Sequence, residues 1–207
     1  MASANQPRFI SLEGGEGVGK STQIQTLAER LRAAGNEVVT TREPGGPIRD
    51  LLVKGDADWH PRTEALLHFA ARSEHLENVV HPALKGGKWV VCDRFADSTM
   101  AYQGMVQGAG VRYVSELYHL VVGDFAPDLT LVMDMPFDIG LQRAADRGDG
   151  EDRYERMGAA FHEKLRQAFL DIVSANQERC VVVDASGTPD DVADAIWQVV
   201  ADRFGIA

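Results

Sequence analysis

One run of residues in this sequence has the types and spacing that suit phosphate chemistry. Residues 14–21 match the pattern G-x-x-x-x-G-K-[ST] at every fixed position, and the run ends in Lys20 and Ser21. Glycines let successive backbone N–H groups turn toward a polyphosphate, and the N-terminus of a following helix adds partial positive charge. In such a loop the lysine reaches the β and γ phosphates and the hydroxyl ligates Mg²⁺. The run therefore predicts a nucleoside triphosphate site.

The residues around this loop have the pattern that such a site needs. Residues 9–12 are mostly apolar, as in a short buried strand. Residues 21–34 carry apolar side chains at a helical spacing, at Ile24, Leu27, Ala28 and Leu31. Because strand, glycine loop and helix follow one another in the required order, a chance glycine-rich turn is the weaker interpretation.

Two further predicted strands end in charged residues. Residues 37–41 lead into Arg42, and residues 88–92 lead into Asp93 and Arg94. Open α/β sheets bind ligands beyond the carboxyl ends of their strands, so we expect these side chains to face the glycine loop. Asp93 has the position of the acid that organises Mg²⁺ through water in phosphoryl-transfer enzymes.

Two other segments allow more than one interpretation. Phe69 and Arg72 share a face of the predicted helix 63–84 and could contact a planar base, although alone they are more typical of a core phenylalanine and a solvated arginine. This helix has a second apolar stripe that could face a partner subunit. Residues 146–153 are rich in charge and glycine, which is typical of a solvated loop or of a lid carrying arginines.

Predicted strands and helices alternate along the chain. The strands are residues 9–12, 37–41, 88–92, 129–134 and 180–183, and the helices are 21–34, 63–84, 111–122, 137–147, 154–175 and 189–204. This order predicts an α/β fold of the P-loop NTPase type, in which a five-stranded parallel sheet lies between helices. At 207 residues, one domain is expected over residues 1–207.

Composition narrows the choice of function. Asp and Glu number 31 against 21 Lys and Arg, a net charge of −10, which argues against a general nucleic-acid binder. No apolar run reaches about 18 residues and residues 1–8 lack signal-peptide features, so we expect no membrane span and a cytoplasmic protein. Cys92 and Cys180 lie in apolar runs and are interpreted as core residues.

Three blocks of the sequence, taken together, resemble the bacterial thymidylate kinases of the P-loop nucleoside monophosphate kinase superfamily. They are residues 13–22, residues 41–46, and residues 93–95 with the nearby Ser98, Ala101, Tyr102 and Gln103. The similarity runs from about Phe9 to the last helix. It implies phosphorylation of dTMP to dTDP with ATP and Mg²⁺, and a homodimer packed through helices.

The resemblance also implies roles for individual residues. The ATP site would be Gly14, Gly15, Glu16, Gly17, Val18, Gly19, Lys20, Ser21 and Thr22, with Arg143 stacked on adenine. The dTMP site would be Arg42 and Arg94 on the phosphate, Phe69 and Arg72 on thymine, Tyr102 on the deoxyribose, Ser98 and Gln103 on base and sugar, and Glu16 near the sugar hydroxyl. Ser21 and, through water, Asp93 would hold the metal. Catalysis would rest on Lys20, Arg94 and Glu16, with Arg147 and Arg153 supplied by a lid at about residues 146–154.

These implied roles agree with the chemistry of the acceptor. The phosphate of dTMP is largely dianionic near neutral pH, so it needs no general base. It needs cancellation of the repulsion between two polyanions held in line, which arginines, a lysine and a metal ion provide.

The chain is shorter than the family pattern between Gly46 and Ile48 and at residues 148–152.

Two other classes of function stay open at the level of sequence. A kinase for another monophosphate or for a deoxynucleoside is the nearest. A deoxynucleoside acceptor would need a carboxylate base near its hydroxyl, and Glu16 or Asp93 could take that role. A nucleotide sensor with little turnover is the other, although Lys20, Ser21 and the lid arginines together argue for catalysis. The Asn-Lys-x-Asp motif expected of a GTPase switch is absent from the sequence.

Overall fold

A five-stranded parallel sheet forms the centre of the molecule. The computed structural model describes residues 6–53, 57–147 and 153–206, with Arg147 described only as the last residue of its helix. The strands are β1 (Phe9–Glu13), β2 (Val38–Arg42), β3 (Trp89–Asp93), β4 (Leu129–Asp134) and β5 (Cys180–Asp184), in the order β2-β3-β1-β4-β5. Every neighbouring pair is parallel, which confirms the predicted fold class.

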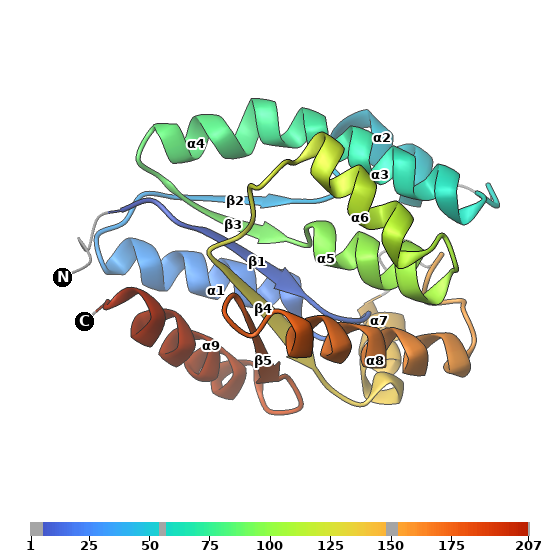
Figure 1. Cartoon of the computed structure of the whole chain (residues 1–207). Coiled ribbons are helices and arrows are strands. Elements are labelled where there is room, and N and C mark those ends of the chain that lie inside the picture. Colours follow the sequence, from blue (N-terminus) through green and yellow to red (C-terminus); the bar gives the residue numbers. More distant parts are fainter. Residues whose placement is uncertain (1–5, 54–56, 148–152, 207) are drawn as a thin grey trace.

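Helical segments connect and cover the strands (Figure 1). They are α1 (Lys20–Ala33), α2 (Gly46–Val53), α3 (Pro61–His75), the π-helical η1 (Leu76–Val80), α4 (His81–Lys85), α5 (Ala96–Thr99), the π-helical η2 (Met100–Val106), α6 (Val111–Val121), α7 (Phe137–Arg147), α8 (Ala159–Ala175) and α9 (Pro189–Phe204). The predicted helix 63–84 is thus one continuous run from α3 to α4, with a π-helical stretch in its middle.

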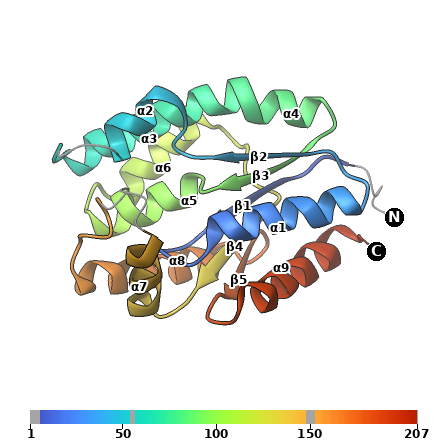
Figure 2. The same cartoon turned by 180° about the vertical axis from the view of Figure 1, so that it is seen from behind.

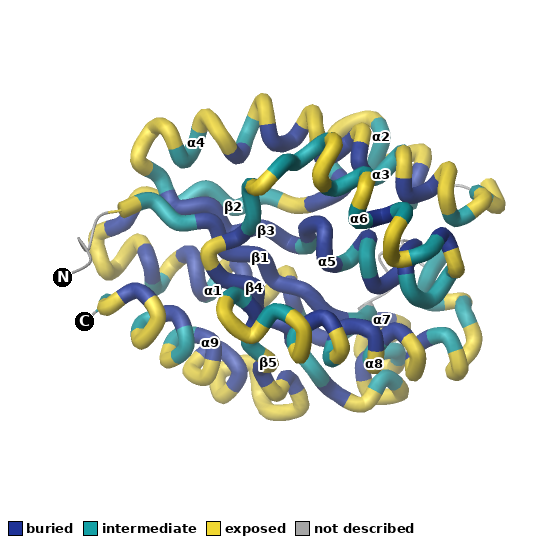
Figure 3. Tube along the Cα trace, viewed as in Figure 1, coloured by how far each residue is buried: buried dark blue, intermediate teal, exposed yellow. Residues whose placement is uncertain are grey.

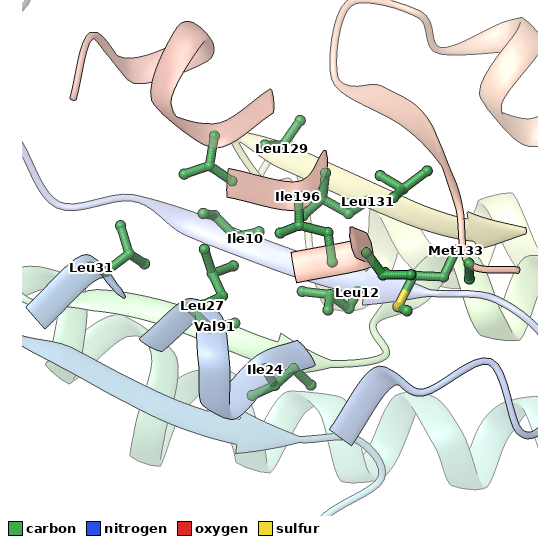
Figure 4. Close-up of a cluster of buried hydrophobic side chains, with 14 of the residues drawn as sticks. Ile10, Leu12, Ile24, Leu27, Leu31, Val91, Leu129, Leu131, Met133 and Ile196 are labelled. Atoms are coloured by element: carbon green, nitrogen blue, oxygen red, sulfur yellow. The ribbon is translucent and has the colours of Figure 1, made fainter. Parts of the chain in front are cut away.

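The three central strands are buried on both faces, as expected for a parallel sheet with helices on each side. One face packs against α1 and α9 through a cluster that includes Ile10, Leu131 and Ile196 (Figures 2 and 4). The other face packs against the α3 to α4 run, η2 and α8, and it buries Phe9 and Val132. Figure 3 shows buried strands between helices with exposed outer faces.

Three local predictions were incomplete. Helix α2 follows directly after the Glu43-Pro44-Gly45 turn and was not predicted, because its Gly-Pro start hides a helical pattern of apolar residues. The segment α5 to η2 was interpreted only as a polar cluster, because small and polar residues dominate it. Helix α8 begins at Ala159 rather than at residue 154, since Tyr154 lies in a turn that ends at Gly158.

Candidate active site

The glycine loop lies between β1 and α1, at the carboxyl ends of the strands. Gly17 has a φ of 68°, and a Cβ added there would lie 1.7 Å from the carbonyl oxygen of Gly140 in α7. Only glycine fits this close approach, so the loop and α7 are packed backbone to backbone. The Nζ of Lys20 donates hydrogen bonds to the carbonyl oxygens of Gly14 at 3.1 Å and Gly15 at 2.7 Å.

Lys20 is buried beside other charged groups. Burial, followed by the positive charge of Arg94, lowers the pKa of Lys20 to about 8. Its ammonium group is thus poorly solvated and faces a loop whose backbone N–H groups suit anions. A bound polyphosphate would add negative charge beside this lysine, next to the carboxylates of Glu16 and Asp93.

Ser21 and Asp93 form a pair of hard oxygen donors at the start of α1. The Ser21 hydroxyl donates to Oδ2 of Asp93 at 3.2 Å, while Oδ1 of Asp93 is buried without a hydrogen-bond partner. Mg²⁺ favours one or two such ligands together with water and phosphate oxygens. The unpartnered carboxylate oxygen fits this requirement, so Ser21 and Asp93 would hold a Mg²⁺ ion. Within the described residues no cluster of three or more His, Cys, Asp or Glu offers another metal site.

Arg94 is the central cation of the site. Its φ of 67° lies in the left-handed region that non-glycine residues seldom adopt, and such backbone strain is typical of functional positions. Nη1 donates to the carbonyl oxygen of Gly14 and to the hydroxyl of Ser98, both at 3.0 Å. Nη2 donates to Glu16 at 2.9 Å and to the Tyr102 hydroxyl at 3.1 Å. The guanidinium is therefore fixed between the phosphate loop and η2.

Glu16, an acidic residue inside a phosphate loop, is neutralised by its neighbours. Burial acts to raise its pKa, but the charges of Arg94 and Lys20 outweigh it and lower the pKa of Glu16 to about 2. The Tyr102 hydroxyl donates to the same carboxylate at 2.6 Å. Glu16 is thus an anion that orients an arginine and a tyrosine.

A second acid, Glu13, ends β1 with no exposed surface. One oxygen accepts the backbone N–H of Phe95 at 2.7 Å and the other accepts the Ser98 hydroxyl at 2.5 Å. Burial and the nearby Asp97 raise the pKa of Glu13 to about 8. This residue ties the end of β1 to the start of α5.

A cavity of about 430 Å³ opens between these groups and the helices on one face of the sheet. It brings together most of the predicted site residues: Glu16, Gly17, Val18, Gly19, Lys20, Ser21, Thr22, Arg42, Asp93, Arg94, Ser98, Tyr102 and Gln103. Arg42 is half exposed, and its Nη2 lies 3.8 Å from Oδ2 of Asp93. Gly14 and Gly15 line a separate small cavity on the other side of the loop.

Phe69 and Arg72 do not line this cavity. Phe69 is 1 % exposed and packs among Ala65, Ala109 and Val114. The ring that α3 contributes to the cavity wall is that of His68. The proposed stacking of Phe69 on thymine stays a prediction, and in this structure it would require the ring to leave a packed core.

Arg72 is held rigidly behind the wall. Its guanidinium carbon lies 4.7 Å from the centre of the Phe69 ring and 5.1 Å from that of Phe95. Nε donates to Glu43 at 2.8 Å and Nη2 to Thr99 at 3.1 Å, whereas Nη1 is buried without a partner. One donor of this arginine therefore has no acceptor within the protein.

The remaining predicted arginines lie apart from the cavity's centre. Arg143 donates to the carbonyl oxygens of Ala185, at 3.3 Å, and Ser186, at 3.5 Å, in the loop after β5. Nη1 of Arg153 lies 2.7 Å from Oε1 of the buried Glu64. The side chain of Arg147 and residues 148–152 of the predicted lid lie outside the described residues.

The sequence interpretation gave no role to several residues of the cavity wall, and three of them matter most to its structure. His68 precedes Arg72 by four positions and so shares its helix face, a signal that the i, i+3 pairing with Phe69 obscured. Glu43 lies in the block of residues 41–46, but nothing in that block indicated its pairing with Arg72. Tyr154 accepts a hydrogen bond from Gln103 at 3.2 Å and donates one to Glu64 at 2.7 Å, and no pattern in the sequence indicated this.

Comparison with known proteins agrees with this geometry. The family model described as thymidylate kinase matches residues 12–196. A thymidylate kinase of Caulobacter vibrioides is 52 % identical over 204 residues, covering 96 % of this chain and 98 % of the relative. Those of Nitrobacter hamburgensis and Bradyrhizobium diazoefficiens are 48 % and 46 % identical, and they cover 97 % and 98 % of this chain and 90 % and 92 % of their own lengths. Among the described residues no helix is long and apolar enough to cross a membrane. This chain belongs to the thymidylate kinase family.

Proposed function

We propose that this protein transfers the γ-phosphoryl group of ATP to the phosphate of dTMP, giving dTDP and ADP. One observation carries the proposal. A single cavity is lined both by the phosphate loop with Lys20 and by Arg42, Arg94 and Tyr102. Two phosphate groups bound in such a cavity would meet between fixed cations, which is the arrangement that in-line phosphoryl transfer requires.

The residues of the chain divide the work between the two nucleotides. The loop N–H groups and Lys20 bind the donor phosphates, with Mg²⁺ on Ser21 and Asp93. Arg94 and Arg42 bind the acceptor phosphate, and Arg94 is already oriented by Glu16. Repulsion between the two anions is thereby reduced without a general base. Arg147 and Arg153 are proposed to add positive charge from the lid to the transferred phosphoryl group. Arg143 is proposed to contact the adenine of ATP.

The protein is further proposed to act in the cytoplasm as a homodimer packed through helices. Leu120 and Val111 of α6 are 81 % and 52 % exposed, and Leu66 of the neighbouring α3 is 48 % exposed. Exposed apolar side chains on two packed helices are the kind of surface that a subunit interface covers. Light scattering should give twice the chain mass, and L120D should shift the protein toward the monomer.

Coupled ADP release tests the reaction. ATP and Mg²⁺ are supplied with dTMP, dUMP, dCMP, dGMP, AMP or thymidine as the acceptor, under identical conditions. Strong release with dTMP is expected, with weaker release for dUMP because one methyl group is worth about 1–3 kcal/mol in an apolar pocket. Release with thymidine but not with dTMP would replace the proposal by a deoxynucleoside kinase, and release independent of acceptor would argue against both.

A further inference from the structure

Glu13 is a buried acid that the proposed reaction does not use directly. It is the last residue of β1, it has no exposed surface, and it is not among the described residues that line the main cavity. Glu13 is therefore not in a position to touch a nucleotide bound there. Burying a carboxyl group costs free energy unless its oxygens are paired, so the partners of Glu13 indicate what it does.

Both partners of Glu13 belong to the segment around Arg94. Oε1 accepts a hydrogen bond from the backbone N–H of Phe95, the residue after Arg94, at 2.7 Å. The backbone N–H of Arg94 itself donates to the carbonyl oxygen of Leu12, the residue before Glu13, at 3.0 Å. Two consecutive N–H groups after β3 are thus held by the end of β1.

Arg94 has a backbone conformation that needs such support. A non-glycine residue at a φ of 67° is strained, and the strain persists only where the surrounding structure fixes it. Phe95 is almost fully buried, so removing the carboxyl group of Glu13 would leave the buried N–H of Phe95 without that acceptor. The turn would then relax, and the side chain of Arg94 would move with it.

The second oxygen of Glu13 is linked to the guanidinium group through one hydroxyl. Ser98 donates to Oε2 of Glu13 at 2.5 Å, and it accepts a hydrogen bond from Nη1 of Arg94 at 3.0 Å. Hydrogen bonds in such a chain polarise and strengthen one another. One carboxyl group thus fixes both the backbone of Arg94 and the end of its side chain.

We propose that Glu13 is a positioning residue for phosphoryl transfer, which acts by holding Arg94 in the orientation that meets the acceptor phosphate. The inference rests on the proposed function for the role of Arg94. Glu16 differs from Glu13 because it lines the cavity and contacts the guanidinium group directly. Glu13 instead supports Arg94 from the interior of the sheet.

Two substitutions separate the hydrogen bonds of Glu13 from its charge. E13Q keeps the length of the side chain, an acceptor for Phe95 and a polar group for Ser98. It also matches a glutamate that burial and Asp97 keep neutral by raising its pKa to about 8. E13D keeps the carboxyl group but is one methylene shorter, so it cannot reach both partners.

The two variants should differ in their use of dTMP. E13Q should retain the wild-type kcat/KM for dTMP. E13D should lower it about 10-fold, since a misplacement of about 1 Å can cost up to about 100-fold in rate. The KM for ATP should be unchanged in both variants.

A double-mutant cycle tests whether Glu13 acts through Arg94. E13D should lower kcat/KM for dTMP in the wild-type protein but not in R94A, because the group that Glu13 holds is then missing. I196A opens a cavity in the core between the sheet and α9, on the opposite face from Glu13. It should lower the melting temperature and leave kcat/KM for dTMP intact, so it controls for loss of stability alone.

Three results would overturn the assignment while leaving the reaction intact. They are the same proportional loss from E13D in the wild type and in R94A, wild-type kinetics in E13D, and a lowered kcat/KM for dTMP in E13Q. The last of these does not depend on whether E13D folds. If the wild-type protein releases no ADP in response to dTMP, the proposed function fails and this assignment fails with it.

Discussion

The two ends of the cavity are built in different ways. The proposed phosphate side, made of residues 16–22 with Asp93 and Arg94, is mostly one contiguous loop whose backbone N–H groups suit phosphate. The proposed base side has His68, Gln103 and Tyr154 in its wall and Arg72 behind it, and it brings together side chains from three distant segments. A backbone site follows from a local motif, whereas a side-chain site depends on how each helix is rotated. Errors of interpretation are therefore expected at the base side.

Removing the lysine of the phosphate side should have the largest effect. K20A deletes the ammonium group that faces the donor phosphates, and we expect kcat to fall about 10³-fold, as for other groups that stabilise transition-state charge. K164A, on the exposed surface of α8, is the matched control and should retain full activity. A loss below tenfold in K20A would mean that the backbone of the loop does the work alone.

Breaking the support of Arg72 should destabilise the base side. Glu43 and Arg72 are both almost fully buried, and E43A would leave the guanidinium without its carboxylate. The free energy of unfolding should fall by about 3 kcal/mol, measured by urea denaturation. E37A removes an exposed carboxylate paired with Lys88 and should change stability by less than about 0.5 kcal/mol. Equal losses in the two variants would contradict the rigid anchoring of Arg72.

Arg94 links the two sides, so its loss should affect acceptor and chemistry together. R94A should lower kcat/KM for dTMP about 10- to 100-fold, the usual value of hydrogen bonds to a charged group. K88A, at the start of β3 and away from the cavity, should stay within about twofold of the wild type. Comparable losses in steady-state assays of both variants would remove Arg94 from the acceptor site.

The smallest effect is expected from the buried acid between the two sides. Because folded Glu13 keeps its proton up to about pH 8 and a solvated glutamate releases it near pH 4.5, folding binds a proton between these values. The contribution of Glu13 to stability therefore falls as the pH rises through this window. E13Q should gain unfolding free energy relative to the wild type as the pH rises from 5 to 8, because glutamine has no such proton to lose. Parallel stability curves for the two proteins would contradict a raised pKa.

Most of the fold could be predicted from the sequence, since a short run of apolar residues bounded by polar ones is typical of a strand in a parallel sheet. The five strands agree with the structure to within one residue at each end. Helix α2 and the α5 to η2 segment were not recognised, because glycine, proline and small polar residues mask their periodicity. The order of the strands, with β1 between β3 and β4, is a property of packing that no local pattern encodes.

The candidate site shows the same division. The phosphate loop, Arg42, Asp93 and Arg94 were predicted from position alone, because strand ends and glycine spacing fix where they lie. Whether Phe69 or His68 lines the cavity depends on how α3 is rotated about its axis. That rotation is set by contacts of α3 with α6 and η2, which the local sequence does not reveal. The pairing of Arg153 with Glu64 joins residues almost ninety positions apart and has no local signal.

The contact between Gly17 and Gly140 limits how this sequence can vary. A Cβ at Gly140 would lie 2.5 Å from the carbonyl oxygen of Glu16, just as one at Gly17 would meet Gly140. Gly140 belongs to no motif and lies more than a hundred positions from the loop. In a library with every amino acid at position 140, cells whose growth depends on this enzyme's activity should nevertheless retain only glycine there. The close packing of the phosphate loop thus restricts a residue in a distant helix.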